Sequence, residues 1–214
     1  MRGTCTPQTA RMNKHAINVC VVCGGTSAEA EVSRSSAREV ARALRACFAS
    51  VVTLELDASL PALLASMRPQ VVFPVLHGPP GEDGTLQGFL ETMGLPYVGS
   101  GVTASACAMN KHIAKQLFRT AHLPLADDAL LLRDQVHPGD AARIMQRFPE
   151  GAVVKPVDQG SALGVSFAQT RAELEIALDA CFMLSTAALV DRGIRGREIA
   201  SAVLDLNGVR RALP

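Results

Sequence analysis

The sequence predicts an α/β protein that begins with a parallel, doubly wound sheet extending to about residue 100. Three apolar, valine-rich runs are typical of buried strands, and they occupy residues 17–23, 51–56 and 71–76. Between them lie two segments with helical periodicity, 30–48 and 59–67, joined to the strands by short links. Glycines follow the first and third runs directly, at the sheet edge where ligands usually bind.

Composition indicates a folded globular protein rather than a disordered one. Of the 214 residues 48% are hydrophobic, and 21 Lys and Arg against 20 Asp and Glu leave a net charge of +1. The chain has one tyrosine, no tryptophan and no basic stripe interleaved with aromatic residues, so nucleic acid is not expected as a partner. The apolar run at 17–23 is too short to span a membrane, which favours a cytoplasmic location.

The six cysteines are scattered and are expected to be reduced. Cys20 and Cys23 form a CxxC, a spacing that also occurs in redox and zinc sites. No second CxxC and no histidine pair accompanies them, so burial as small apolar side chains on a strand is the favoured interpretation. Residues 1–16 are polar and mildly basic and are expected to be an N-terminal extension, with Met12 as an alternative start.

The first two helices are each expected to bury one face. In helix 30–48 the predicted apolar stripe consists of Val40, Leu44, Cys47 and Phe48. Polar residues outside that stripe include Ser33, Arg34 and Arg38. The second helix is expected to begin with Ser59 as its N-cap and with Pro61 in its first turn.

The third strand, Val71–Leu76, leads into a polar loop. The loop, HGPPGEDG at 77–84, contains three glycines and two prolines, which argues against regular structure. It places His77 and the carboxylates of Glu82 and Asp83 at the C-terminal end of the strand. The helix after it is expected to start near Thr85 and to carry on one face Leu86, Phe89, Leu90 and Met93.

In the second half of the chain, the pattern predicts a helix that starts at Asn110 and has Lys111 in its first turn. The residues of this helix expected to face inward are Ile113, Leu117 and Ala121. The elements expected after it are strand 129–132, helix 140–148, strand 152–155, helix 170–182 with a Thr170–Glu173 capping box, and strand 187–190. Two last strands, 200–204 and 209–213, are expected to form a hairpin around Asn207-Gly208.

Lys155 is a lysine on an apolar strand, so it must extend to solvent or meet an anion. The following loop contains Gly160 and Gly164, which would let backbone N–H groups approach a phosphate. A hairpin with a solvent-directed lysine is the plainer alternative.

Three strings together resemble the D-alanine–D-alanine ligase family of the ATP-grasp superfamily. They are GGTSAEAEVSRSSA at 24–37, HGPPGEDGTLQGFLE…GLPYVGSG…MNK at 77–111, and KPVDQGSALGVS at 155–166. The resemblance covers the chain from Ile17 onward. It implies a Rossmann-like substrate domain at 17–105, a central ATP-grasp subdomain at 106–183, and at 184–214 the start of a C-terminal subdomain, so that the ATP-grasp domain is incomplete.

The resemblance also implies roles for single residues. Glu29 would anchor the amino group of a first D-alanine, with His77 beside its carboxylate and Ser161 orienting it within a hydrogen-bond network that includes Glu29. The residues that would bind ATP are Lys111, Lys155, Asp191 and Glu198. Asp191 stands where a longer Glu is usual, and Gly193 where a bulky residue is common.

The implied reaction is ATP-dependent condensation of two D-alanines for peptidoglycan synthesis, in a cytoplasmic enzyme that is expected to be a homodimer. The resemblance ends before the family does, and the ligands of Mg²⁺ are expected in the final third that has no counterpart here. The rival interpretation is therefore a remnant that binds nucleotide or a partner without turnover. Two further alternatives are a nicotinamide-dependent dehydrogenase at Gly24-Gly25, and D-serine or D-lactate as second substrate.

Overall fold

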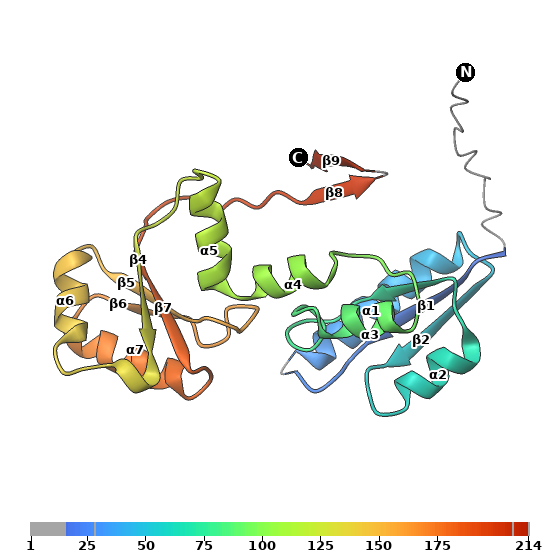
Figure 1. Ribbon diagram of the computed structural model, residues 1–214, viewed down its shortest axis with the longest axis horizontal. Helices are drawn as coiled ribbons and strands as arrows, with labels where there is room; N and C mark the ends of the chain where they lie inside the picture. Colours follow the sequence, from blue (N-terminus) through green and yellow to red (C-terminus); the bar gives the residue numbers. More distant parts are fainter. Residues whose placement is uncertain (1–15, 28, 207, 214) are drawn as a thin grey trace, which may run out of the picture.

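The computed structural model describes residues 16–27, 29–206 and 208–213. Residues 1–15 of the expected N-terminal extension, including Met12, lie outside the described residues. The described chain forms two lobes, each built on its own sheet, and helix α4 leads from one lobe to the other (Figure 1). Among the described residues, no helix is both long and apolar enough to cross a membrane.

The first lobe confirms the predicted parallel, doubly wound sheet. Its strand order is β2-β1-β3, and both pairings are parallel. The strands are β1 (Asn18–Cys23), β2 (Ser50–Glu55) and β3 (Val71–Pro74). Strand β3 is two residues shorter than expected, and Val72 also forms a parallel bridge with Tyr97. The helices of this lobe are α1 (Ala30–Arg45), α2 (Leu60–Met67) and α3 (Thr85–Thr92).

The two faces of this sheet are covered by different helices, because successive side chains of β1 point to opposite sides. Cys20 and Val22 pack with α2 and α3, whereas Val21 and Cys23 pack with α1. The interpretation of the CxxC as buried strand residues is confirmed. Burial, and then the neighbouring Cys23 thiol, raise the pKa of Cys20 to about 11, which keeps it protonated and unreactive.

The prediction of which side of α1 faces the sheet is wrong. The side chains that α1 buries are those of Ser33, Ala37 and Ala41. Val40 and Leu44 are only partly buried beside them, and Cys47 is exposed. Ser33 points inward because its hydroxyl ties two strand ends together. Its Oγ accepts a hydrogen bond from the Gly24 N–H at 2.8 Å and donates one to the Val75 carbonyl.

Ser59 also differs from its prediction. It occupies the N-cap position of α2, and Pro61 lies in the first turn as expected, but the Ser59 side chain makes no capping bond. The hydroxyl donates instead to Asp57 Oδ1 at 2.6 Å, and the same oxygen accepts the Ser59 N–H at 2.8 Å. Asp57 is a charged acceptor two residues upstream, and it captures the hydroxyl that would otherwise cap the helix.

The second lobe is an antiparallel sheet with strand order β4-β7-β5-β6. Its strands are β4 (Asp128–Leu132), β5 (Ala152–Pro156), β6 (Ser166–Ala168) and β7 (Ala187–Arg192). Helices α6 (Asp140–Arg147) and α7 (Arg171–Phe182) cover one face, and a short 3₁₀ helix, η2 (Arg133–Gln135), follows β4. The predicted capping box of Thr170 and Glu173 is present at the start of α7.

Helices α4 (Val102–Met109) and α5 (Lys111–Thr120) connect the lobes. Sequence analysis did not predict α4, and the expected domain boundary between 105 and 106 falls inside it. The predicted inward face of α5 is wrong, since Ile113 is 42% and Leu117 52% exposed, and Ala121 is also exposed. The side chain that α5 buries is Lys115, because charge pairing rather than apolar packing fixes this helix.

The chain ends in the expected hairpin, β8 (Val203–Leu206) with β9 (Val209–Ala212), although the first strand starts three residues later than predicted. Asn207 lies outside the described residues, and Gly208 has the positive φ of +77° typical of such turns. Both strands are exposed along their whole length.

We expect Ser33→Ala to lower the free energy of unfolding by about 1–3 kcal/mol, because a buried N–H and a carbonyl lose their shared partner. Denaturant unfolding of the purified chain measures this. Ser35→Ala is the matched control, since Ser35 is exposed on the same helix, and it should change stability by no more than about 0.5 kcal/mol. Equal effects of the two substitutions would show that the Ser33 bridge contributes nothing.

Candidate functional site

Two glycine-rich loops meet between the lobes. One is the 77–84 loop after β3, and the other is the 157–165 loop between β5 and β6. A Cβ at Gly160 would lie 3.9 Å from the Cα of Gly78, an ordinary van der Waals distance, so the two loops pack directly against each other. The same point lies 3.6 Å from Glu82 Oε2 and 3.9 Å from Glu29 Oε2. Two carboxylates therefore face the contact.

Glu29 precedes α1 directly and does not cap it. Its partly exposed side chain lines a cavity of about 160 Å³, together with Ser27, Gly78, Pro79, Gln159, Gly160 and Leu163. A space of this size suits a small amino acid, and an ionised carboxylate can bind its ammonium group. Among the described residues, His77 has a buried Nε2 without a hydrogen-bond partner, and His77 is not one of the residues that line this cavity.

A second cavity, of about 570 Å³, lies on the other side of Gly160. Glu82, Lys111 and Ser161 line it with residues of α3 and α4. Glu82 is fixed there, because its Oε2 accepts the Gly78 N–H at 2.6 Å. Ser161 and Glu29 thus face different cavities, and within the described chain no hydrogen bond links them, although the resemblance implies a shared network.

Lys111 ties α5 to the 157–165 loop. Its backbone N–H donates to the Val157 carbonyl at 2.9 Å, and its Nζ donates to the Gln159 carbonyl. Burial, and then the positive charge of the nearby Lys155, lower the pKa of Lys111 below the usual 10.5. Two half-buried ammonium groups at the base of a glycine-rich loop have the charge and the setting that a polyphosphate ligand would need.

The 157–165 loop has an unusual backbone. Ser161 and Ala162 both have positive φ, +42° and +60°. Gly164, with φ of +71°, leaves no room for a side chain, because a Cβ there would lie 2.6 Å from Leu184 Cδ1 and 2.7 Å from Pro156 Cγ. Such conformations are rare for residues other than glycine and are concentrated at ligand-binding segments.

Lys155 lies on β5 and points away from α6 and α7, toward α5. Its Nζ is 2.7 Å from Asp191 Oδ2, and Lys115 Nζ is 2.6 Å from Asp191 Oδ1. Asp191, which the resemblance assigns to the nucleoside, therefore has a lysine on each oxygen. Glu198 is exposed in the irregular segment after β7, and none of its contacts within the described residues brings it to this group.

The structure brings five of the seven predicted site residues to the loops or to the lysine pair at their base: Glu29, His77, Lys111, Lys155 and Ser161. Asp191 lies directly behind Lys155, and Glu198 lies apart. Sequence analysis missed two charged residues of this region. It placed Glu82 in the loop without assigning it to the site, and it did not mention Lys115. Lys115 could have been found from its position, since it is one turn after Lys111 on the same helix face.

Glu55, the last residue of β2, has its partners within the first lobe. Arg34 binds it at 2.6 Å and lowers its pKa, and the Gly25 N–H donates to it at 3.2 Å. A further cavity, of about 650 Å³, lies between the η2–α6 segment and α7. It contains none of the predicted site residues.

Comparisons with known proteins all point to one family. Residues 59–100 match the family described as D-ala D-ala ligase N-terminus, and residues 117–214 match D-ala D-ala ligase C-terminus. The D-alanine--D-alanine ligase of Geobacter sulfurreducens is 42% identical over 86% of this chain and 57% of its own length. That of Syntrophobacter fumaroxidans is 38% identical over 95% of this chain and 65% of its own length.

Solved structures give the same result. The D-alanine-D-alanine ligase of Coxiella burnetii is 30% identical, with a TM-score of 0.79 over 92% of this chain and 69% of that one. The Bacillus anthracis ligase complexed with ATP is 27% identical, with a TM-score of 0.74 over 85% of this chain and 60% of that one. The chain spans between 41% and 65% of the length of the curated relatives compared with it. The chain has a Rossmann-like lobe and an ATP-grasp lobe, and it matches the N-terminal and C-terminal family models in order. It therefore belongs to the D-alanine–D-alanine ligase family.

Proposed function

We propose that this chain provides the substrate-binding and phosphate-binding part of an ADP-forming D-alanine–D-alanine ligase. The observation that carries the proposal is the position of Lys111 and Lys155 beneath the 157–165 loop, where a Cβ at Gly160 would lie within 4 Å of both Glu29 and Glu82. A phosphate site and carboxylates that suit an ammonium group thus lie on adjoining segments. The relatives that support it are all D-alanine--D-alanine ligases.

The reaction would proceed in two steps. A carboxylate oxygen of the first D-alanine attacks the γ-phosphorus of ATP, the bond to the bridging oxygen breaks, and ADP leaves. The amine of the second D-alanine, having lost a proton, then attacks the carbonyl carbon of the acyl phosphate. The tetrahedral intermediate expels inorganic phosphate and leaves the peptide bond. Positioning and charge stabilisation account for most of the acceleration of such transfers.

The described residues would have separate tasks in this scheme. Glu29 would hold the ammonium group of the first D-alanine, with His77 at its carboxylate and Ser161 orienting it. Lys111 and Lys155 would balance the charge of the transferring phosphoryl group. Glu198 would hold the nucleoside of ATP, a role that the resemblance also implies for Asp191.

ATP is normally used with Mg²⁺, and we propose the same here, without any step that depends on a protein-bound metal. Residues 16–27, 29–206 and 208–213 contain no group of three or more His, Cys, Asp or Glu side chains placed to hold a metal ion. The described residues therefore do not fit a complete magnesium site. What they do fit is the polyphosphate.

We propose several further properties for the protein. They are the division at 105/106 and 183/184, the cytoplasmic location, the role in peptidoglycan precursor synthesis, the small-molecule substrates without nucleic acid, and a homodimer. The mass of the purified chain in solution, measured by light scattering, decides the last. D-Serine and D-lactate remain alternatives for the second substrate.

The test of the function is ADP release by the purified chain with ATP, Mg²⁺ and D-alanine. We expect release that requires D-alanine, that is absent with L-alanine, and that falls at least about a hundredfold in Lys155→Ala, because a phosphate-binding charge is lost. ATP affinity of the same samples is measured by titration calorimetry.

Binding of ATP without any release would support the rival function, nucleotide binding without turnover. A chain that binds neither ATP nor D-alanine would contradict both functions. Release that continues unchanged in Lys155→Ala would contradict the role given to that lysine.

The lowered pKa of Lys111 predicts a pH limit for ATP binding. Below that pKa the ammonium group is charged and can bind phosphate, and as the pH rises through it the charge and the affinity are lost. The affinity should therefore begin to fall at a pH below the usual lysine value of 10.5. Calorimetric titrations at a series of alkaline pH values measure it. Lys111→Arg stays charged and should bind ATP to higher pH, so an identical fall in both proteins would refute the assignment.

A further inference from the structure

Lysine is scarce in this chain and is concentrated at one place. The sequence contains 17 arginines but only four lysines, at positions 14, 111, 115 and 155. Lys14 lies outside the described residues, and the other three gather where α5 packs on the sheet of the second lobe. The proposed function uses two of them. The third, Lys115, has no role in it.

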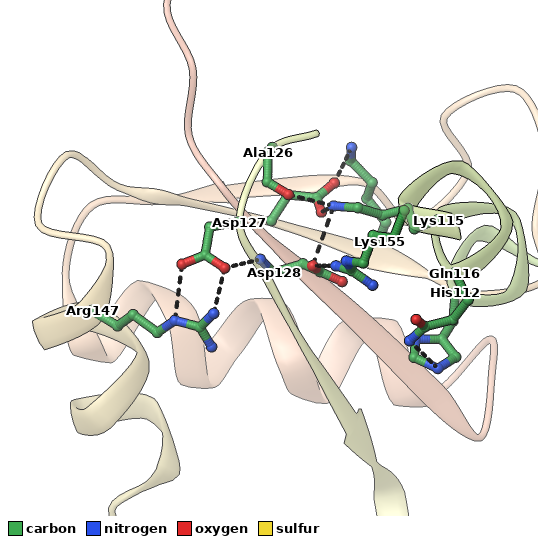
Figure 2. Close-up of polar contacts among 10 residues, drawn as sticks. His112, Lys115, Gln116, Ala126, Asp127, Asp128, Arg147 and Lys155 are labelled. Atoms are coloured by element: carbon green, nitrogen blue, oxygen red, sulfur yellow. Dashed lines mark hydrogen bonds and ion pairs between the residues drawn. The ribbon is translucent and has the colours of Figure 1, made fainter. Parts of the chain in front are cut away.

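Lys115 is held by three oxygen atoms. Its Nζ lies 2.6 Å from Asp191 Oδ1, 2.9 Å from the Ala126 carbonyl oxygen and 3.6 Å from Asp128 Oδ1 (Figure 2). Only 11% of its side chain is exposed, against 30% for Lys155. Because its ammonium group is enclosed by these oxygens, Lys115 cannot reach a ligand between the lobes.

Asp191 links Lys115 to the phosphate site. Its side chain is 10% exposed, and its two oxygens are divided between Lys115 and Lys155. On the neighbouring strand, the residue paired with Asp191 is Asp128, and the ion-pair partner nearest to Asp128 is Arg119. Opposed carboxylates on adjacent strands repel each other, so Lys115, between them, compensates both.

The charges of this cluster determine what Lys155 can offer to a phosphate. With Lys115, Lys155 and Asp191 all ionised, the three side chains carry a net charge of +1. Without Lys115, the remaining pair of Lys155 and Asp191 is neutral, and Lys155 would be the only lysine bound to Asp191. Without both Lys115 and Asp191, the net charge of +1 is restored.

We propose that Lys115 is a positioning residue for the phosphate site: it takes up one oxygen of Asp191, so that Lys155 keeps a net positive charge for the polyphosphate of ATP. The inference rests on the proposed function in one respect, that Lys155 binds phosphate. It assigns Asp191 a role through the two lysines, without contact with the nucleoside.

The test compares the affinity of the purified chain for ATP and for inorganic triphosphate, measured by calorimetry. Triphosphate has no nucleoside, so it reports on the phosphate site alone. We expect Lys115→Met to weaken both ligands by about tenfold, the order expected for one unit charge lost near a partly solvated anion. The double variant Lys115→Met/Asp191→Asn should return to within about threefold of the original chain, because the net charge is the same again.

Arg119→Met is the matched control. It removes one positive charge from the same helix, but Arg119 pairs with Asp128 and makes no ion pair with Asp191, so affinity should change by less than about twofold. Thermal unfolding of every variant checks that it is folded. The difference between Lys115→Met and the original chain should also shrink as salt is raised, because salt screens a charge effect and leaves a packing defect unchanged.

Each other outcome overturns the proposal. Unchanged affinity in Lys115→Met would show that Asp191 does not limit Lys155. A double variant as weak as the single one would show that Lys115 only supports the fold. Recovery for triphosphate but not for ATP would return Asp191 to the nucleoside. An original chain that binds neither ligand would overturn the proposed phosphate site and this inference together, whereas normal binding with no effect of Lys115→Met would overturn this inference alone.

Discussion

The contact between the two glycine-containing loops, at Gly78 and Gly160, is the constraint on which the site depends. Each loop belongs to a different lobe and follows a strand of a different sheet. A side chain larger than a methyl group at Gly160 would push against Glu82, Glu29 and the Gly78 backbone at once. Lys111 holds one of the loops through two carbonyl groups, so the helix that connects the lobes also sets the position of the site.

The second lobe shows how charge can replace apolar packing as the force that orients a helix. Helix α5 has apolar residues on one side, but these are exposed, and the side it presents to the sheet carries Lys111 and Lys115. Burying a lysine is unfavourable unless its charge is met, and here two aspartates and a carbonyl group meet it. The lysines on the sheet-facing side of α5 therefore both orient the helix and supply the charge proposed for the phosphate site.

Sequence patterns predicted most of the fold because most elements follow local rules. The valine-rich strands, the Thr170–Glu173 capping box and the glycine-containing hairpin depend on neighbouring residues, and all three are present. Ser33 and α5 were placed wrongly because their orientation depends on partners more than 40 residues away, at Val75 and Asp191. For the site, the resemblance named Glu29, His77, Lys111, Lys155, Ser161, Asp191 and Glu198, and their roles stay predictions. The resemblance could not show that Glu82 faces the same loop contact or that Lys115 shares Asp191, since neither pairing leaves a local pattern.

The pairing of β4 with β7 has a consequence for how the second lobe assembles. The register places Asp128 opposite Asp191, so pairing of the two strands at that end is destabilised while both carboxylates are unmatched. Helix α5 carries the lysine and the arginine that match them. Strand pairing and helix docking are therefore coupled, and neither is favourable alone. An ordered lobe with a detached α5 would be a high-energy species, so this part of the chain should fold and unfold as one cooperative unit.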